Sequence, residues 1–308
     1  MRYLTRVLFI AFIFIPLAQV VSADSPSPII LHKWGVMGVD EGNFSHPGSV
    51  AADSMGNVYV ADTDNNRIQK FDTKGKFITK WGSYGIGDGQ FSRPNGIAVD
   101  SKGNVYVVET YNYRIQKFTS NGAFVTKWGS LGHGDGELNQ PVGIDVDSKG
   151  NIYVADTQNN RIQKFDTKGK FMTKWGSNGA GDGQFLYPTG IAVDSKGNVY
   201  VADYHNRIQK FTSNGAFVTR WGSTGDGHGE YNQPFGIDVG SKGNIYVADT
   251  FNSRIQKFDP KGKHITCWGT NGSGDSQFRT PNDVAVDSEG NIYVADTDNY
   301  RIQKFARP

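Results

Sequence analysis

Residues 94–129 read PNGIAVDSKGNVYVVETYNYRIQKFTSNGAFVTKWG and contain one complete structural unit. Its apolar and polar residues alternate in GIAVD, NVYVVE, RIQKF and AFVTKWG, which predicts four short strands. DSKGN and TSNG read as tight turns, because Asp caps turn amides and Gly accepts a positive φ. One such four-stranded antiparallel sheet exposes both of its faces, so it must pack against other sheets to be stable.

The unit is repeated six times along the 308 residues. Its first proline recurs at intervals of 47, 47, 47, 46 and 47 residues, as Pro47, Pro94, Pro141, Pro188, Pro234 and Pro281. A fixed period of this length indicates a repeat architecture, and six small sheets packed around an axis bury one another. The sequence therefore predicts an all-β, six-bladed β-propeller with four-stranded antiparallel blades.

The two ends of the repeat array are complementary. The last RIQKF, residues 301–305, is not followed by a fourth strand, whereas IILHKWG at 29–35 matches AFVTKWG at 123–129. We expect residues 29–35 to complete the sixth blade, which closes the ring in a 1+3 arrangement.

The N-terminus has the pattern of a secretory signal. Arg2 and Arg6 precede an apolar run from Val7 to Val21, and VSA at 21–23 supplies small residues for cleavage before Asp24. The alternative, an uncleaved anchor, requires a longer span than this Pro-containing run. The expected organisation is a signal peptide at 1–23, a linker at 24–28 and one propeller domain at 29–308, in a secreted, periplasmic or cell-surface protein without a stable membrane span.

The pattern PxGIAVDSKGNVYVADTxNxRIQKF resembles the NHL repeat, a propeller-forming motif, and the resemblance extends over all six units. It implies the fold but no single activity, because one propeller fold hosts many functions. Some six-bladed relatives are amidating lyases and lactonases with a metal in the central channel. Some intracellular NHL domains bind RNA through a basic loop face.

Charge and cysteine content narrow these alternatives. Removal of residues 1–23 takes away two Arg and no acid, which leaves 30 basic and 30 acidic residues. A neutral chain with acidic GDGQ and GDGE loops is a poor nucleic-acid binder, because phosphate neutralisation dominates such affinity. Cys267 is the only cysteine, so no intramolecular disulfide forms. We expect a monomer.

The loops that precede the first strand and join the second and third strands share one face of the ring, here named the loop face. Their tips differ between repeats, whereas the opposite, Lys-rich turn face is nearly constant. A fixed scaffold with varied tips is typical of a binding surface, although exposed tips also drift without function. Aromatic residues are common interface anchors, so the candidate ligand-binding residues are Tyr111, Tyr113, Tyr187, Tyr204, His205, Phe235 and Phe251. The predicted partner is a protein, a peptide or a cell-surface glycan.

The innermost strands carry three acids where other repeats have small residues. Asp145 and Asp238 replace Ala, and Asp283 replaces Gly. If these carboxylates converge on the axis, they are candidate ligands for a hard cation such as Ca²⁺. The alternatives are a water-filled lining or bonds to a neighbouring strand. No His lies on an inner strand, and we assign no catalytic residue. The alternative function is a metal-dependent, lyase- or lactonase-like enzyme that uses these acids.

A further Asp and Arg flank the second loop of most repeats, as in Asp62 and Arg67. The segment between them lacks the Gly and the distal Glu of a calcium loop. Because the pair recurs around the ring, we expect it to hold loop backbone in place.

Overall fold

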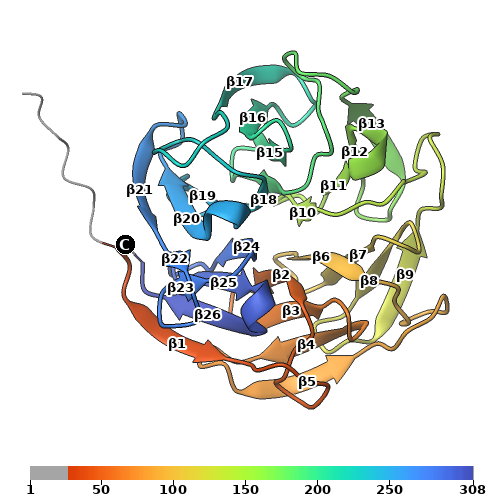
Figure 1. The fold of residues 1–308 in the computed structure, drawn as a ribbon. Coiled ribbons are helices and arrows are strands. Elements are labelled where there is room, and N and C mark those ends of the chain that lie inside the picture. Colours follow the sequence, from red (N-terminus) through yellow and green to blue (C-terminus); the bar gives the residue numbers. More distant parts are fainter. Residues whose placement is uncertain (1–26, 308) are drawn as a thin grey trace, which may run out of the picture.

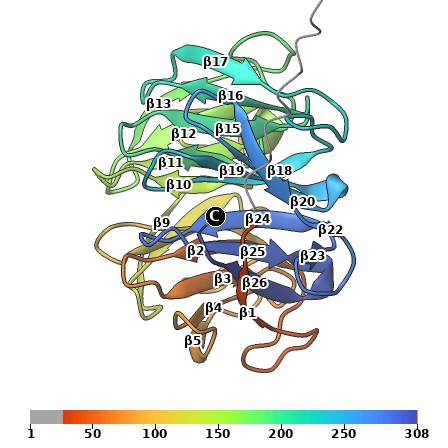
Figure 2. The ribbon, with the colours of Figure 1, turned by 90° about the vertical axis from the view of Figure 1, so that its left-hand side faces the viewer.

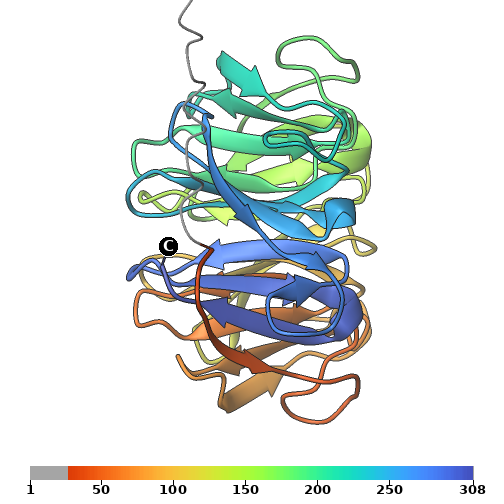
Figure 3. The same ribbon diagram turned by 60° about the vertical axis from the view of Figure 1, so that its left-hand side comes forward.

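The computed structural model describes residues 27–307 and shows a ring of β-sheets around a central axis (Figure 1). Figures 2 and 3 show the same ring from the side, as a flat disc. Helical structure within 27–307 is limited to three short 3-10 turns, η1 (Thr157–Asn159), η2 (Thr250–Asn252) and η3 (Thr297–Asn299). No helix in this part of the chain is long and apolar enough to cross a membrane.

Five blades are built from consecutive strands, ordered from the axis outward. The first is β2 (Pro47–Ala52), β3 (Val58–Asp62), β4 (Arg67–Phe71) and β5 (Phe77–Trp81). The second is β6 (Pro94–Val99), β7 (Val105–Glu109), β8 (Arg114–Phe118) and β9 (Phe124–Trp128). The third is β10 (Ile144–Val146), β11 (Ile152–Asp156), β12 (Arg161–Phe165) and β13 (Phe171–Trp175). The fourth is β14 (Ile191–Val193), β15 (Val199–Asp203), β16 (Arg207–Phe211) and β17 (Phe217–Trp221). The fifth is β18 (Pro234–Val239), β19 (Ile245–Asp249), β20 (Arg254–Phe258) and β21 (His264–Trp268).

The sixth blade joins the two ends of the chain. Its sheet order is β1 (Ile30–Trp34), β26 (Arg301–Phe305), β25 (Ile292–Asp296) and β24 (Pro281–Val286). β1 pairs antiparallel with β26, with Trp34 opposite Ile302 and Lys33 opposite Gln303. In Figure 1 the red β1 runs beside the blue β26. The predicted six-bladed fold is confirmed, and the pairing is the 1+3 closure expected from residues 29–35. A minor parallel pair, β22 (Thr270–Asn271) with β23 (Gln277–Phe278), lies in the loop after β21.

The core lies between blades rather than within them. One cluster combines Val58, Val60 and Phe71 of the first blade with Tyr293 and Ile302 of the sixth, all fully or almost fully buried. Equivalent clusters fill the other five seams. Each blade thus buries its two faces against its neighbours, as expected for sheets too small to be stable alone.

Asp-centred turns build the turn face. In the second blade the amides of Lys102 and Asn104 both donate to Asp100 Oδ1 at 2.9 Å. Gly103 has φ +78°, a left-handed conformation that side chains disfavour. The DSKGN motif therefore forms the tight turn that its residue types predict.

A buried Asp–Arg pair anchors the loops of the opposite face. Arg67 Nε donates to Asp62 Oδ2 at 2.6 Å, and its other nitrogens donate to the carbonyls of Val39, Asp40 and Asn43. Each of the other five blades repeats this pair, and in the second blade Glu109 takes the place of Asp. The pair has the structural role expected of it, since it fixes the loop that leads into each inner strand.

Candidate functional site

The variable residues of the loop face are held in a backbone conformation that costs energy. The residue before each inner-strand proline has φ between +43° and +51°: His46, Arg93, Gln140, Tyr187, Gln233 and Thr280. Residues other than Gly rarely adopt this left-handed region, and glycine would relieve the strain. All six positions nevertheless carry side chains, and strain of this kind is concentrated at functional sites.

Neighbouring blades hold these residues in place. Asn66 Oδ1 accepts the amide of Arg93 at 3.0 Å, across the seam between the first and second blades. Asn160 does the same for Tyr187 at 2.9 Å, and Asn206 for Gln233 at 2.6 Å. In these three repeats the Asn before RIQKF therefore fixes the backbone of the next blade's loop residue.

A cavity of about 480 Å³ opens on the loop face at the end of the axial channel; we call it the bowl. Its walls come from the loops of several blades, including Asp64 from the first, Tyr204 from the fourth and Phe251 from the fifth. Gly48, Asn95, Phe235 and Asn282 line both the bowl and the channel below it, so the two spaces are continuous.

One wall of the bowl is polar. His46 Nδ1 lies 2.8 Å from Asp64 Oδ2, and His46 Nε2 lies 3.8 Å from Asp298 Oδ1. Arg93 Nη1 lies 3.6 Å from the other oxygen of Asp64. The ring of His46 also contacts that of Tyr300 edge-on, with centroids 5.0 Å apart. Two carboxylates therefore face one guanidinium and one imidazole, so this wall carries charged groups of both signs.

The other wall is aromatic and contains three of the predicted ligand residues: Tyr204, Phe235 and Phe251. Phe251 is 54% exposed, whereas Phe235 and Tyr204 are half-buried. Tyr187 packs edge-on against Tyr204, with ring centroids 5.9 Å apart. Burial raises the pKa of Tyr204 above its ordinary value, so its hydroxyl stays protonated in neutral solution. The structure thus brings four of the seven predicted residues to one place.

The remaining three lie around the bowl rather than in its wall. Tyr111 is 50% exposed and lies beneath the guanidinium of Arg93, 5.7 Å from ring centroid to Cζ. Tyr113 and His205 are half-buried residues of the loops that join the second and third strands of their blades. Neither is among the described residues that line the bowl. They remain predicted loop-face residues without a cavity of their own.

Sequence reasoning missed the polar wall. His46, Asp64, Arg93 and Asp298 occupy the same variable positions that identified the loop face, but an aromatic criterion selected the candidates. The useful signal was positional, because any residue before the inner-strand proline is directed by the same left-handed backbone.

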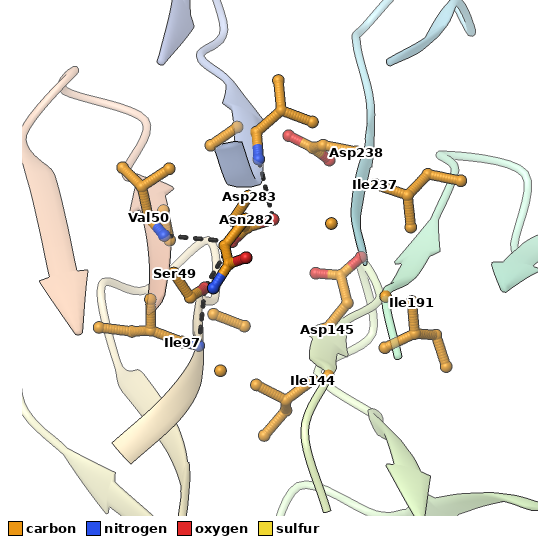
Figure 4. Close-up of a pocket in the computed structure, with 18 of the residues that line it drawn as sticks. Ser49, Val50, Ile97, Ile144, Asp145, Ile191, Ile237, Asp238, Asn282 and Asp283 are labelled. Atoms are coloured by element: carbon orange, nitrogen blue, oxygen red, sulfur yellow. Dashed lines mark hydrogen bonds between the residues drawn. The ribbon is translucent and has the colours of Figure 1, made fainter. Parts of the chain in front are cut away.

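The channel itself contains a cavity of about 220 Å³, and the three inner-strand acids line it (Figure 4). Asp145 on β10 accepts the amide of Val146 and, at 2.7 Å, the amide of Val193 on the next blade. The same pair of bonds recurs between other blades: Asp238 with Val239 and Val286, and Asp283 with Val284 and Val50. Ser49 Oγ additionally donates to Asp283 at 2.5 Å. The acids therefore link adjacent inner strands, which was one of the alternatives that the sequence left open.

The channel also changes how these acids titrate. Desolvation by burial raises the pKa of Asp145 to about 8, with a further contribution from the charge of Asp238. Burial likewise raises the pKa of Asp283 to about 7 and that of Asp238 to about 6. Bonds from backbone amides oppose these shifts, since they favour the ionised form. The three acids share one narrow space, and repulsion between them disfavours full ionisation.

The geometry gives the predicted Ca²⁺ site no support. Within residues 27–307 no three His, Cys, Asp or Glu side chains gather closely enough to hold a metal ion. A cation site needs carboxylate oxygens directed at one point, whereas these carboxylates are committed to amides of separate strands. Cys267 lies half-buried on β21, away from the channel lining.

A model of the NHL repeat matches residues 44–71, 91–118, 138–165, 185–211, 231–258 and 278–305, more than half of the chain. The chain belongs to the NHL repeat family. The expected resemblance is confirmed, and each match runs from the loop before an inner strand to the end of RIQKF.

Two curated relatives of this NHL propeller are much longer proteins. The chain is 41% identical to Protein brain tumor of Drosophila melanogaster over 75 residues, which are 24% of this chain and 7% of that protein. It is 51% identical to B-box type zinc finger protein ncl-1 of Caenorhabditis elegans over 45 residues, 15% of this chain and 5% of that protein. The chain thus spans less than a tenth of either relative.

Solved structures share the fold at low sequence identity. A Bacteroides thetaiotaomicron protein of unknown function superposes with a TM-score of 0.69 at 20% identity, over 91% of this chain and 75% of that one. Virginiamycin B lyase from Staphylococcus aureus gives 0.59 at 17% identity, over 86% and 96%. These likenesses show the propeller architecture and carry no activity to this chain.

Proposed function

We propose that this NHL propeller is an exported binding module that takes its ligand in the bowl on the loop face. One observation carries the proposal: strained left-handed positions retain side chains around a cavity that is aromatic on one wall and polar on the other. A concave site with an apolar wall and a few convergent polar groups is typical of ligand binding.

The partner classes follow from the surface and from the leader. The signal predicted at residues 1–23 lies outside the described residues, and we propose that it directs the protein out of the cytoplasm. There a protein, a peptide or a glycan of the cell surface is available as a partner. Nucleic acid is not favoured, because Asp64 and Asp298 offset Arg93 in the bowl. We propose that the module acts as a monomer.

The alternative function, a metal-dependent lyase- or lactonase-like enzyme, has the likeness of fold in its favour. The described residues of the channel give this alternative no further support, because the three acids are bonded to amides of neighbouring strands. We therefore assign no catalytic residue and no cofactor.

The test presents the mature protein to a random peptide display library and to a saccharide array. A loop-face variant, Tyr204→Ala with Phe251→Ala, is compared with a turn-face variant, Lys102→Ala with Lys149→Ala. We expect some probes to bind the wild-type protein and the turn-face variant but not the loop-face variant, provided that all three proteins unfold at similar temperatures. The proposal is contradicted if both variants bind the same probes as the wild-type protein, or if no probe binds any of the three proteins.

A further inference from the structure

We propose that the bowl recognises a neutral saccharide unit, which stacks on the aromatic wall and offers its hydroxyls to the polar wall. This inference rests on the proposed function and names the ligand class of the same site. Three properties of the bowl carry it: its charged groups of both signs, its mixture of hydrogen-bonding groups and its aromatic wall.

The charged groups of the bowl point to a neutral ligand, because they are of both signs. Arg93 lies 3.6 Å from Asp64, and Asp298 lies 3.8 Å from the imidazole of His46. Among the described residues no lysine lines the bowl. An anionic ligand would meet the two carboxylates, and a cationic ligand would meet the guanidinium. A neutral ligand avoids both repulsions.

The polar groups suit hydroxyls. Carboxylates accept hydrogen bonds, a guanidinium donates them, and the amides of Asn95, Asn282 and Gln233 do both. A hydroxyl is both donor and acceptor, so several adjacent hydroxyls match this mixture.

The aromatic wall suits the other side of the same ligand. Phe251 presents more than half of its surface to solvent beside Phe235 and Tyr204, and Tyr187 supports Tyr204 from behind. A pyranose ring has a face of C–H groups that packs against an aromatic ring, while its hydroxyls lie at the edge. One ligand then reaches both walls of a cavity of about 480 Å³.

The occupied edges of the inner strands argue against a peptide ligand. Peptides are commonly bound by addition to a free strand edge, as a helix in a long groove, or in an extended proline groove. The inner strands turn their edges into the channel, where Asp145, Asp238 and Asp283 already take amides of β14, β24 and β2. No free edge of these inner strands is therefore offered to a peptide strand.

Saturation-transfer NMR with four methyl glycosides (of glucose, galactose, mannose and N-acetylglucosamine) at millimolar concentration tests the inference on the mature protein. We expect at least one glycoside to receive saturation, strongest at its ring C–H protons. Phe251→Ala should weaken its affinity about tenfold or more, as truncation of a central aromatic anchor does. Tyr84→Ala, at a loop tyrosine that is 75% exposed and outside the bowl, is the matched control and should leave affinity unchanged.

Two results overturn the saccharide assignment: no glycoside receives saturation from wild-type protein, or Phe251→Ala binds as wild type does. Asn282→Ala removes an amide that lines the bowl; it gives a second reading that does not depend on the aromatic wall, and it should weaken the same glycoside. If all glycosides fail while a peptide binds the loop face, the ligand class is wrong and the proposed function stands. If the loop-face variant retains every probe, the proposed function itself fails.

Discussion

Replacement of Trp34 by Ala tests the closing seam, by which we mean the pairing of β1 with β26. Trp34 is a half-buried residue of β1, and its ring contacts those of Phe71 and Tyr293 with centroids 5.7 and 6.4 Å away. A fully buried Trp→Ala change costs roughly 3–5 kcal/mol, and each aromatic pair contributes roughly 0.5–1.5 kcal/mol. For a half-buried Trp with two such contacts, we expect a loss of about 2–3 kcal/mol in the free energy of unfolding.

Trp128 supplies the matched control. It occupies the same position in the second blade and contacts Phe165 and Tyr106 at 6.1 and 6.4 Å. Trp128→Ala should therefore cost a similar free energy of unfolding in urea. The two variants should differ at the seam, because β9 follows β8 through a short turn, whereas β1 joins β26 by non-covalent pairing alone.

The readout is hydrogen exchange at Ala306, whose amide donates to the carbonyl of Ile29 at 2.8 Å across the seam. A loss of about 2 kcal/mol in the stability of the β1 pairing corresponds to about thirtyfold faster exchange at this amide. We expect this acceleration in Trp34→Ala and not in Trp128→Ala. Equal exchange at Ala306 in the two variants would mean that β1 does not separate from β26 locally.

Three further predictions concern the channel, the loop anchors and the leader. Because burial raises the pKa values of the channel acids, the folded protein keeps protons that the unfolded chain releases above about pH 4. Their contribution to stability should therefore be greatest at low pH and fall as pH rises towards about 8, and urea titrations should show a smaller fall in Asp145→Asn. Arg161→Met leaves the buried Asp156 carboxylate unpaired and should cost about 3–5 kcal/mol in urea unfolding, whereas loss of the exposed Lys174–Asp135 pair in Lys174→Ala should cost less than about 1 kcal/mol. Mass spectrometry of the exported protein should find Asp24 at its N-terminus, and retention of residues 1–23 would contradict the predicted cleavage.

The architecture was predictable from the sequence because every level of the pattern agreed. Alternation gave the strands, Asp–Gly motifs gave the turns, and a constant period gave the number of blades. The match of residues 29–35 to the fourth strand of other repeats even indicated the partner of β26. Such agreement between local and global preferences is what specifies one fold.

The site was only partly predictable. The sequence identified the variable loop positions, but it could not show which of them converge, since Tyr113 and Tyr204 occupy similar loops and only Tyr204 reaches the bowl. Convergence depends on the direction in which each loop sends its side chain. For the channel acids, the residue type suggested a cation, whereas the structure shows bonds to amides of the next blade. That outcome depends on the stagger between blades, which no single repeat encodes.

Hydrogen exchange of wild-type protein, with and without the probe that binds it best, shows whether the ligand binds in the bowl of the loop face. We expect slower exchange in the loop segments 45–47, 92–95, 203–206, 250–253 and 297–300, with exchange in the turn segments 100–104 and 147–151 unchanged. Protection of the turn segments, or of the outer strands β5 and β9 in place of these loops, would contradict this expectation.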